Sequence, residues 1–447
     1  MEVTPRLPHL PSFLLILLLT TYLLPFSSSS ATTTTTTTIS ATAGLVIELL
    51  HVDAHMNLTY QQHIHAAIRR THHRALHHMQ NRKKVPLRQQ ATTLDTPLHG
   101  LNGEYLMSLA LGTPPTSFSA AMDTGSTLIW AKCFHPTDAQ DLPIFDPESS
   151  SSYSTVPCNN SLCNINSVFT GCNGTDCAYM AQYADSSASM GTLSFETLTF
   201  GSLTVNNIGF GCSFRADGFD SYGAAVVGFN RGPLSLVSQL GSLIDHQFSY
   251  CLGGYNASNQ SKLKLGPSSH SITSDASTST QLLVNPASPE HYYVALHGIS
   301  VGGKRLPIPE SVFQFSSDGS GGVVVDSGST FTGLAEEAYS LLKAAFIQEI
   351  GKPSVNTTSL DMETCFQGLP DSISIPTLTF HFEGGDLQVP AENYIAVDSV
   401  KQLSCLAILP TPANVNLIGA TTMQNFLVSF DLGRNMITFT PTQCSTL

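Results

Sequence analysis

The chain has 447 residues, of which 42% are hydrophobic and only 11% charged, and its formal net charge is −13. This apolar content suffices for folded cores and excludes a mainly disordered protein. The acidic balance also argues against a nucleic-acid-binding protein, because binding to phosphates calls for basic surfaces. At about 100–200 residues per domain, the length predicts two or three domains.

An apolar run at residues 10–26 follows Arg6 and precedes the small residues Ser27–Ala31. The run is interrupted by polar residues and prolines, so it falls short of the ~20 apolar residues that span a membrane. It therefore predicts a secretory signal peptide, residues 1–30, with an uncleaved anchor as the alternative. No later stretch has the pattern of a membrane span or a lipid-anchor signal, so we expect no membrane anchor.

The segment after the signal peptide is basic and rich in histidine. Residues 1–100 carry eight of the 19 basic and four of the 32 acidic residues, which leaves a formal charge of −17 for residues 101–447. Apolar spacing at Ile64, Ile68 and Ala75 predicts a helix over residues 59–80, and residues 81–100 have the polar composition of a linker. The predicted helix also carries His63, His65, His72, His73, His77 and His78.

From Tyr105 onward, short alternating strands separated by Gly, Pro, Asn and Ser predict a mostly-β body. Residues 105–111 and 436–439 are typical of such strands, whereas 233–243 and 335–350 have helical patterns. A Ser/Thr-rich stretch, Ser268–Thr280, has little to bury and is the best boundary between two lobes.

The body contains an internal repeat. Asp123-Thr124-Gly125 recurs as Asp326-Ser327-Gly328, each time after apolar strand residues. Downstream of each copy come two aliphatic residues and a glycine, at 226–228 and at 417–419. Two similar lobes would bring these two aspartates together.

Two neighbouring carboxylates share one proton, so one can activate a water while the other donates to a carbonyl oxygen. In this hypothesis the glycines allow the turns to approach, and the flanking hydroxyls join the turns or donate to the carboxylates. These residues are Thr124, Gly125, Ser126, Ser327, Gly328 and Ser329. Either tripeptide alone would be typical of an ordinary turn, and the repeat is what favours catalytic Asp123 and Asp326.

With these motifs the chain resembles the pepsin-like aspartic proteases, and within them the atypical plant branch that includes nepenthesins. The resemblance covers about Gly103 to Cys444. It includes Gly112-Thr113-Pro114-Pro115, Ile144-Phe145-Asp146-Pro147, Gly232-Pro233-Leu234-Ser235-Leu236, Phe248-Ser249-Tyr250-Cys251 and Gln424-Asn425-Phe426-Leu427-Val428. The resemblance implies a mostly-β bilobal fold with the active-site cleft between two pseudo-symmetric lobes.

A flap over the cleft is part of that implied fold. Its tyrosine matches Tyr183, and the family tryptophan beside the tyrosine hydroxyl matches Trp130, the only Trp in the chain. Ala184 and Ser186 stand where the family usually has glycine, which would stiffen the flap or reshape its contact with substrate.

The resemblance also implies an organisation and an activity. We expect a signal peptide (1–30), a propeptide (31–98), an N-terminal lobe with the flap and a Cys-rich insertion (99–275) and a C-terminal lobe (276–447). The implied function is that of an aspartic endopeptidase, made as a zymogen, which hydrolyses protein or peptide substrates at acid pH. The alternative is a weak or inactive protease-fold binding or inhibitor protein. We expect a monomer without a cofactor, secreted to the apoplast or sent to the vacuole.

The propeptide is expected to inhibit the enzyme. As a lysine does in related zymogens, Lys83, Lys84 or Arg88 would pair with the ionised dyad. Acid would weaken this attachment and charge the six helix histidines, whose mutual repulsion would help to release the helix. The alternative is that these histidines are simply a solvated helix face.

Ten cysteines in an exported chain predict disulfides. The family pairing implies Cys158–Cys177, Cys163–Cys172, Cys251–Cys444 and Cys365–Cys405, and Cys133 and Cys212, which lack their usual partners, are expected to pair with each other. N-glycosylation sequons occur at Asn57, Asn159, Asn173, Asn256, Asn259 and Asn356. The histidines of the body are scattered, so we expect no metal site.

Overall fold

The structure is a computed structural model that describes residues 45–52, 59–80, 105–133, 144–165, 168–183, 187–217, 219, 225–254, 261–266, 276–355, 362–411 and 414–447. The predicted signal peptide, the predicted linker and residues 184–186 of the flap lie outside the described residues. All of the described residues belong to one compact unit. No described helix has the length and apolar character needed to cross a membrane.

The predicted mostly-β body is confirmed. Before the predicted lobe boundary the strands are β2 (Tyr105–Leu111), β3 (Thr116–Asp123), β4 (Trp130–Lys132), β5 (Ser154–Thr155), β6 (Phe169–Asn173), β7 (Asp176–Gln182), β8 (Ala188–Phe200), β9 (Leu203–Asp217), β10 (Ala225–Gly228), β11 (Gln247–Cys251) and β12 (Ser261–Leu265). The long strands β8 and β9 pair in antiparallel fashion, and β7 adds to β8, so that β7 and β8 form the hairpin that carries the flap.

The second half is built in the same style. Its strands are β13 (Thr278–Leu283), β14 (Tyr293–Val294), β15 (Leu296–Val301), β16 (Lys304–Arg305), β17 (Val323–Val325), β18 (Thr332–Ala335), β19 (Cys365–Gln367), β20 (Leu378–Phe382), β21 (Gly385–Val389), β22 (Ile395–Asp398), β23 (Leu403–Leu406), β24 (Ile408–Thr411), β25 (Asn416–Ile418), β26 (Phe426–Asp431) and β27 (Met436–Pro441). Strand β13 begins at Thr278, so the last residues of the Ser/Thr-rich stretch belong to a strand of this half.

The sequence repeat is also a structural repeat. In the first half β10 runs parallel to β3 and places Gly228 opposite Asp123. In the second half β25 runs parallel to β17, directly before Asp326. A Cβ atom at Gly228 would lie 2.4 Å from the Thr127 carbonyl carbon, and one at Gly419 2.3 Å from the Phe331 carbonyl oxygen. The repeated glycines are therefore needed because the backbone passes directly against the segment that follows each aspartate.

A central group of strands joins the two halves. β11 pairs with β26, and the rings of Phe248 and Phe430 stack there with their centroids 4.5 Å apart. An N-terminal strand that the sequence analysis did not predict, β1 (Leu45–His51), lies between β2 and β12 and pairs with both. Ile47 and Leu49 are buried in the main core, so the segment before the body is part of its sheet.

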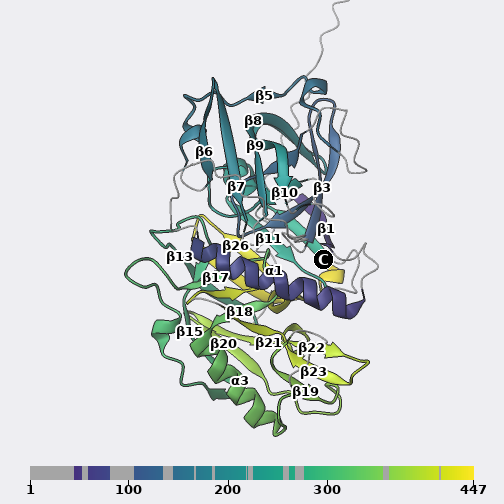
Figure 1. The fold of residues 1–447 in the computed structure, drawn as a ribbon, viewed down its shortest axis with the longest axis vertical. Helices are drawn as coiled ribbons and strands as arrows, with labels where there is room; N and C mark the ends of the chain where they lie inside the picture. Colours follow the sequence, from purple (N-terminus) through teal and green to yellow (C-terminus); the bar gives the residue numbers. More distant parts are fainter. Residues whose placement is uncertain are drawn as a thin grey trace, which may run out of the picture. The chain divides into compact units, whose positions relative to one another are not determined.

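The helices follow the predicted segments closely. Helix α1 spans Tyr60–Gln80 and lies beside β18, with further contacts to β24 (Figure 1). Helix α3 spans Glu336–Ile350. The helix predicted over 233–243 is shorter than expected: α2 spans Leu236–Leu240, with Ser235 capping its N-terminus and Gly241 at its C-terminal cap, and a 3₁₀ turn follows at Gly241–Ile244.

Candidate active site

The two Asp-Ser/Thr-Gly turns lie together and are fully buried. Asp123 ends β3 and Asp326 follows β17, and neither side chain is exposed to solvent. The Gly125 amide donates to Asp123 Oδ1 at 2.9 Å, and the Gly328 amide donates to Asp326 Oδ1 at 2.8 Å. Each turn therefore fixes its own carboxylate through an equivalent backbone hydrogen bond.

The residues after the aspartates lock the two turns to each other, as the sequence predicts. The Ser327 amide donates to Thr124 Oγ1 at 2.8 Å, and the Thr124 amide donates to Ser327 Oγ at 3.2 Å. This reciprocal pair crosses between segments about two hundred residues apart, so the carboxylates are placed by the tertiary structure.

The glycines of the turns permit this close approach. A Cβ atom at Gly125 would lie 2.7 Å from Asp326 Oδ1, and a Cβ atom at Gly328 would lie 2.5 Å from Asp123 Oδ1. Each turn therefore touches the aspartate of the other, and any side chain at these positions would push the two carboxyl groups apart.

The predicted symmetry of the flanking serines holds on one side only. Ser329 Oγ donates to Asp326 Oδ2 at 3.0 Å, as expected. The same prediction for Ser126 is wrong, because its buried hydroxyl makes no hydrogen bond to any described residue. At the other aspartate, Oδ2 instead accepts a hydrogen bond from Nη2 of Arg74, which belongs to α1, at 2.7 Å. An arginine thus takes the place that a serine has at Asp326.

Helix α1 makes a series of polar contacts along the second turn. Arg74 Nε donates to the Gly328 carbonyl at 3.2 Å, and Arg70 Nε donates to Thr330 Oγ1 at 2.9 Å. The Phe331 amide donates to Thr71 Oγ1 at 2.7 Å. Backbone and hydroxyl groups beside the dyad are therefore occupied by one face of the helix.

Among the described residues, Arg74 is the cation that contacts Asp123. The residues predicted for this role, Lys83, Lys84 and Arg88, lie outside the described part of the chain, so the sequence analysis did not single out Arg74. Arg70 and Arg74 are four residues apart and hence on one helix face, flanked by the small residues Ala67, Thr71 and Ala75. This pattern of two arginines among small residues could have indicated the docking face in the sequence, because small side chains let a helix approach its neighbours closely.

The apolar contacts of α1 hold it against the second half of the body. Ile64, Ala67 and Ile68 pack in a cluster with Phe331 and Leu409, among others. Among the helix histidines, His63 is buried and its ring lies 5.2 Å from that of His51 in β1. His65 and His72 are half-buried, so these three do not form a solvated face, and the other three side chains lie outside the described residues.

The flap tyrosine and the tryptophan meet as the resemblance implies. Trp130 Nε1 donates to Tyr183 Oη at 2.6 Å, and both side chains are buried. Burial, and next the negative charge of Asp123, hold the pKa of Tyr183 well above its usual value of 10.0. The phenol therefore stays neutral throughout the acid range and keeps its proton for donation.

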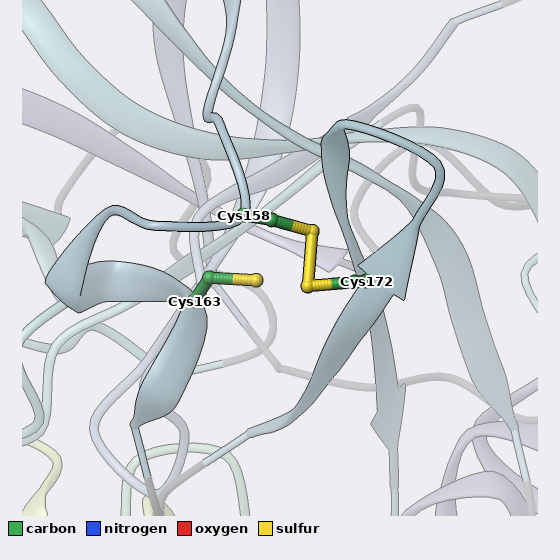
Figure 2. A group of neighbouring side chains, drawn as sticks. All are labelled: Cys158, Cys163 and Cys172. Atoms are coloured by element: carbon green, nitrogen blue, oxygen red, sulfur yellow. A yellow bond between two sulfur atoms is a disulfide. The ribbon is translucent and has the colours of Figure 1, made fainter.

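Three of the five predicted disulfides are present: Cys133–Cys212, Cys251–Cys444 and Cys365–Cys405. The other two predicted pairings, Cys158–Cys177 and Cys163–Cys172, are wrong. The structure instead joins Cys158 to Cys172 (Figure 2) and Cys163 to Cys177.

Burial explains this exchange of partners. Cys172 and Cys177 stand opposite each other in the β6–β7 hairpin. The strand pairing alone would therefore allow each of them to bond to Cys158 or to Cys163. Cys163 and Cys177 are buried in the cluster with Trp130 and Tyr183, whereas Cys172 is exposed and Cys158 half-buried. Although the sulfurs of Cys158, Cys163 and Cys172 lie within 4.8 Å of one another, all are disulfide-bonded and offer no thiolate for a metal.

Two of the predicted sequons can be placed. Asn159 and Asn173 are exposed and both lie in the Cys-rich insertion, while Asn57, Asn256, Asn259 and Asn356 lie outside the described residues.

The fold and the paired turns define a pepsin-like aspartic protease fold with two lobes. Family models described as "Xylanase inhibitor N-terminal" and "Xylanase inhibitor C-terminal" match residues 105–267 and 291–441. The chain is 41% identical over 407 residues to aspartic proteinase nepenthesin-1 of Nepenthes gracilis, covering 90% of each chain. It is 39% identical to nepenthesin-2 of the same plant, again over 90% of each. The chain belongs to the nepenthesin-like plant aspartic proteinases.

Solved structures with the same fold are more distant in sequence. The crystal structure of edgp is 22% identical, with a TM-score of 0.64, over 76% of this chain and 92% of that one. Basic 7S globulin from soybean is 19% identical, with a TM-score of 0.62, over 77% of this chain and 95% of that one. These similarities concern the fold alone.

Proposed function

We propose that this chain is an aspartic endopeptidase, made as a zymogen, that hydrolyses peptide bonds at acid pH with a water activated by Asp123 and Asp326. The observation that carries the proposal is the buried pair of turns, in which both carboxylates keep their backbone donors and the two turns are joined by Thr124 and Ser327.

The geometry suits a shared-proton mechanism. Once Arg74 has left, a water bound between the carboxyl groups loses a proton to the ionised aspartate as it attacks the peptide carbonyl. The protonated aspartate donates to the carbonyl oxygen, so neither a covalent intermediate nor a metal takes part. The fixed hydrogen bonds to each Oδ1 keep both groups in place during the transfer, which reduces reorganisation in the transition state.

Residues 31–98 act as an inhibitory propeptide in this proposal. Helix α1 covers the dyad through Arg74 and occupies the Gly328 carbonyl and the Phe331 amide, groups that would otherwise hold a substrate backbone. Acid that neutralises carboxylates of the acidic body weakens its attraction for the basic N-terminal segment and so favours release of the helix.

The same proposal includes export from the cell and function as a monomer. Five disulfides in the described residues favour an oxidising compartment. Exposed Asn159 and Asn173 are accessible for N-glycosylation on that route. The apoplast, or else the vacuole, is then the destination, and proteins or peptides are the substrates.

A second candidate is a weak or inactive protease-fold binding or inhibitor protein. It is favoured by the family models, whose descriptions name an inhibitor. The two candidates differ in one measurable property, which is turnover of a peptide bond.

The test is cleavage of a mixed protein substrate by the full chain across about pH 2 to 7, with and without pepstatin. We expect pepstatin-sensitive activity confined to acid pH, and a loss of about 10³-fold or more in Asp123→Asn and Asp326→Asn, because neither role of the dyad can be omitted. Asp217→Asn, at an exposed position, is the matched control. An inactive parent at every pH, or a dyad variant with a tenth of the parent's activity, would refute the protease assignment.

A further inference from the structure

A cavity of about 50 Å³ lies beside the turn that carries Asp123. It is lined by Gly125, Ser126, Thr127, Leu128, Val168, Phe169, Met180, Ala181, Gln182, Tyr183, Asn230, Glu290 and His291. Among the described residues α1 contributes nothing to this lining, so the helix that covers the dyad leaves this part of the cleft open.

Phe169 is the unusual member of the lining. It comes from β6 in the Cys-rich insertion, and 37% of its side chain is exposed, which makes it one of the few large apolar residues at the described surface. A partly exposed aromatic ring in the lining of a cavity can pack against the apolar group of a ligand, since ligand sites are lined mostly by apolar and aromatic side chains.

The insertion holds this ring in a fixed position relative to the flap. Phe169 pairs with Met180 of β7, the strand that leads directly to Tyr183. The neighbouring Val168 is buried in the same apolar cluster as Trp130 and Tyr183. Two disulfides, Cys158–Cys172 and Cys163–Cys177, tie the hairpin to the segment before it. The ring is therefore carried on a rigid frame, as a recognition residue requires.

Resting on the proposed protease function, we propose that Phe169 is a specificity-determining residue of the cleft. Its ring forms the apolar wall of a subsite on the Asp123 side, which accepts a small or medium-sized aliphatic side chain of the substrate. Leu128, Val168, Met180 and Ala181 supply the rest of the apolar lining, and Ser126 and Thr127, which follow Asp123 in its turn, belong to the polar part. The Cys-rich insertion thereby acquires a role in substrate selection.

The test compares the acid-activated full chain with Phe169→Ser and Phe169→Leu on a peptide library that varies each position on both sides of the cleaved bond. Phe169→Ser should lower kcat/KM about tenfold or more for peptides with Val, Leu or Ile at one single position. Peptides with Ser or Asp there should change less than about threefold, and the effect should fall on KM rather than kcat. Phe169→Leu should retain most of the preference.

Phe214→Ser is the control, since this β9 residue is 60% exposed and does not line the cavity. An unchanged preference at every position in Phe169→Ser, or an equal loss in Phe214→Ser, would overturn the inference while leaving the protease intact.

If the parent cleaves nothing, the proposed function fails. The subsite is then tested independently of activity, by measuring how tightly the parent and Phe169→Ser bind peptides. Affinities are then measured by calorimetry for statine peptides in which Val is moved from position to position. We expect Phe169→Ser to weaken binding of one member of the series by about tenfold. Equal affinities of parent and variant for the whole series would overturn the inference.

Discussion

Nη2 of Arg74 lies 2.7 Å from Oδ2 of Asp123, and the exposed fractions of the two side chains are 2% and 0%. This ion pair joins the N-terminal helix α1 to the centre of the candidate active site. Its position matches that of the hydrogen bond from Ser329 to Asp326, so the pseudo-symmetry of the dyad is broken by a residue from outside the repeat. Breaking a buried pair of this kind is strongly destabilising, because removing one partner leaves the other charge buried and uncompensated.

The Arg74 pair should hold the chain latent. In Arg74→Gln the charge that fixes α1 over the dyad is lost, so we expect cleavage by the full chain near about pH 6 to rise about tenfold or more over the parent. The measurement is the initial rate of peptide cleavage before any processing of the chain. Arg69→Gln is the matched control, since Arg69 lies on the same helix but is exposed. Equal latency of the two variants would show that Arg74 does not hold the helix.

Strand β1 should lose one of its attachments in acid. Glu48 Oε1 lies 2.8 Å from Lys262 Nζ of β12, and the hydrogen bond from Lys262, then its positive charge, lower the pKa of Glu48 below its usual value of 4.5. Because the folded-state pKa is lowered, the stabilisation is present above 4.5 and is lost as the pH falls through the lowered pKa.

Glu48→Gln should therefore reduce the Tm of the full chain at neutral pH, and the difference from the parent should vanish in strong acid. The effect should be small, because Glu48 is exposed and water screens the pair. Adding Lys262→Met to Glu48→Gln should cause no further pH-dependent change, as a double-mutant cycle requires. A Tm difference that persists or grows in acid would contradict the assignment.

Gly125 should tolerate no side chain. A Cβ atom there would lie 2.7 Å from Asp326 Oδ1, so Gly125→Ala must move one of the two turns. We expect a loss of about 1–3 kcal/mol in unfolding free energy and a large fall in kcat. Gly171→Ala is the control, because nothing lies within 4 Å of the added atom, and it should change the unfolding free energy by less than about 0.5 kcal/mol. Similar effects of the two substitutions would mean that the turns are not in tight contact.

The two disulfides of the insertion should differ in how much they stabilise the fold, although they close loops of equal length. Both join residues 14 apart, so the entropy of loop closure predicts about 3 kcal/mol for each. Cys163 and Cys177 belong to the buried cluster that includes Tyr183 and Trp130, whereas Cys172 is exposed. Cys163→Ala/Cys177→Ala should therefore lower the Tm more than Cys158→Ala/Cys172→Ala, and should also reduce kcat/KM by disturbing the flap base.

Peptide mapping of the parent provides an independent check on the connectivity. It should recover Cys158 linked to Cys172 and Cys163 linked to Cys177. The crossed pairing, or a greater Tm loss for the exposed pair, would show that burial does not choose the partners.

Local patterns in the sequence determined the main helices and strands and the residues of the candidate dyad. Apolar spacing was enough for α1 and α3, because a helix buries one face at every third or fourth residue. The repeat of Asp-Ser/Thr-Gly was enough to predict the dyad, because two copies in two similar lobes are expected when the two turns face each other. The hydroxyl residue before each glycine also predicted how the turns meet, and Thr124 and Ser327 do join them.

The tertiary structure alone decided which residues from distant segments meet. The sequence offers many cations before Tyr105, and only the docking of α1 against β18 and β24 selects Arg74 for Asp123. It likewise offers two ways to pair four neighbouring cysteines, and burial beside Trp130 and Tyr183 selects one. Ser126 stands in nearly the same local sequence as Ser329, yet its hydroxyl makes no hydrogen bond to a described residue, because Oδ2 of Asp123 already accepts one from Arg74. Local propensity depends on neighbours along the chain, whereas these choices depend on packing between segments, which no local pattern encodes.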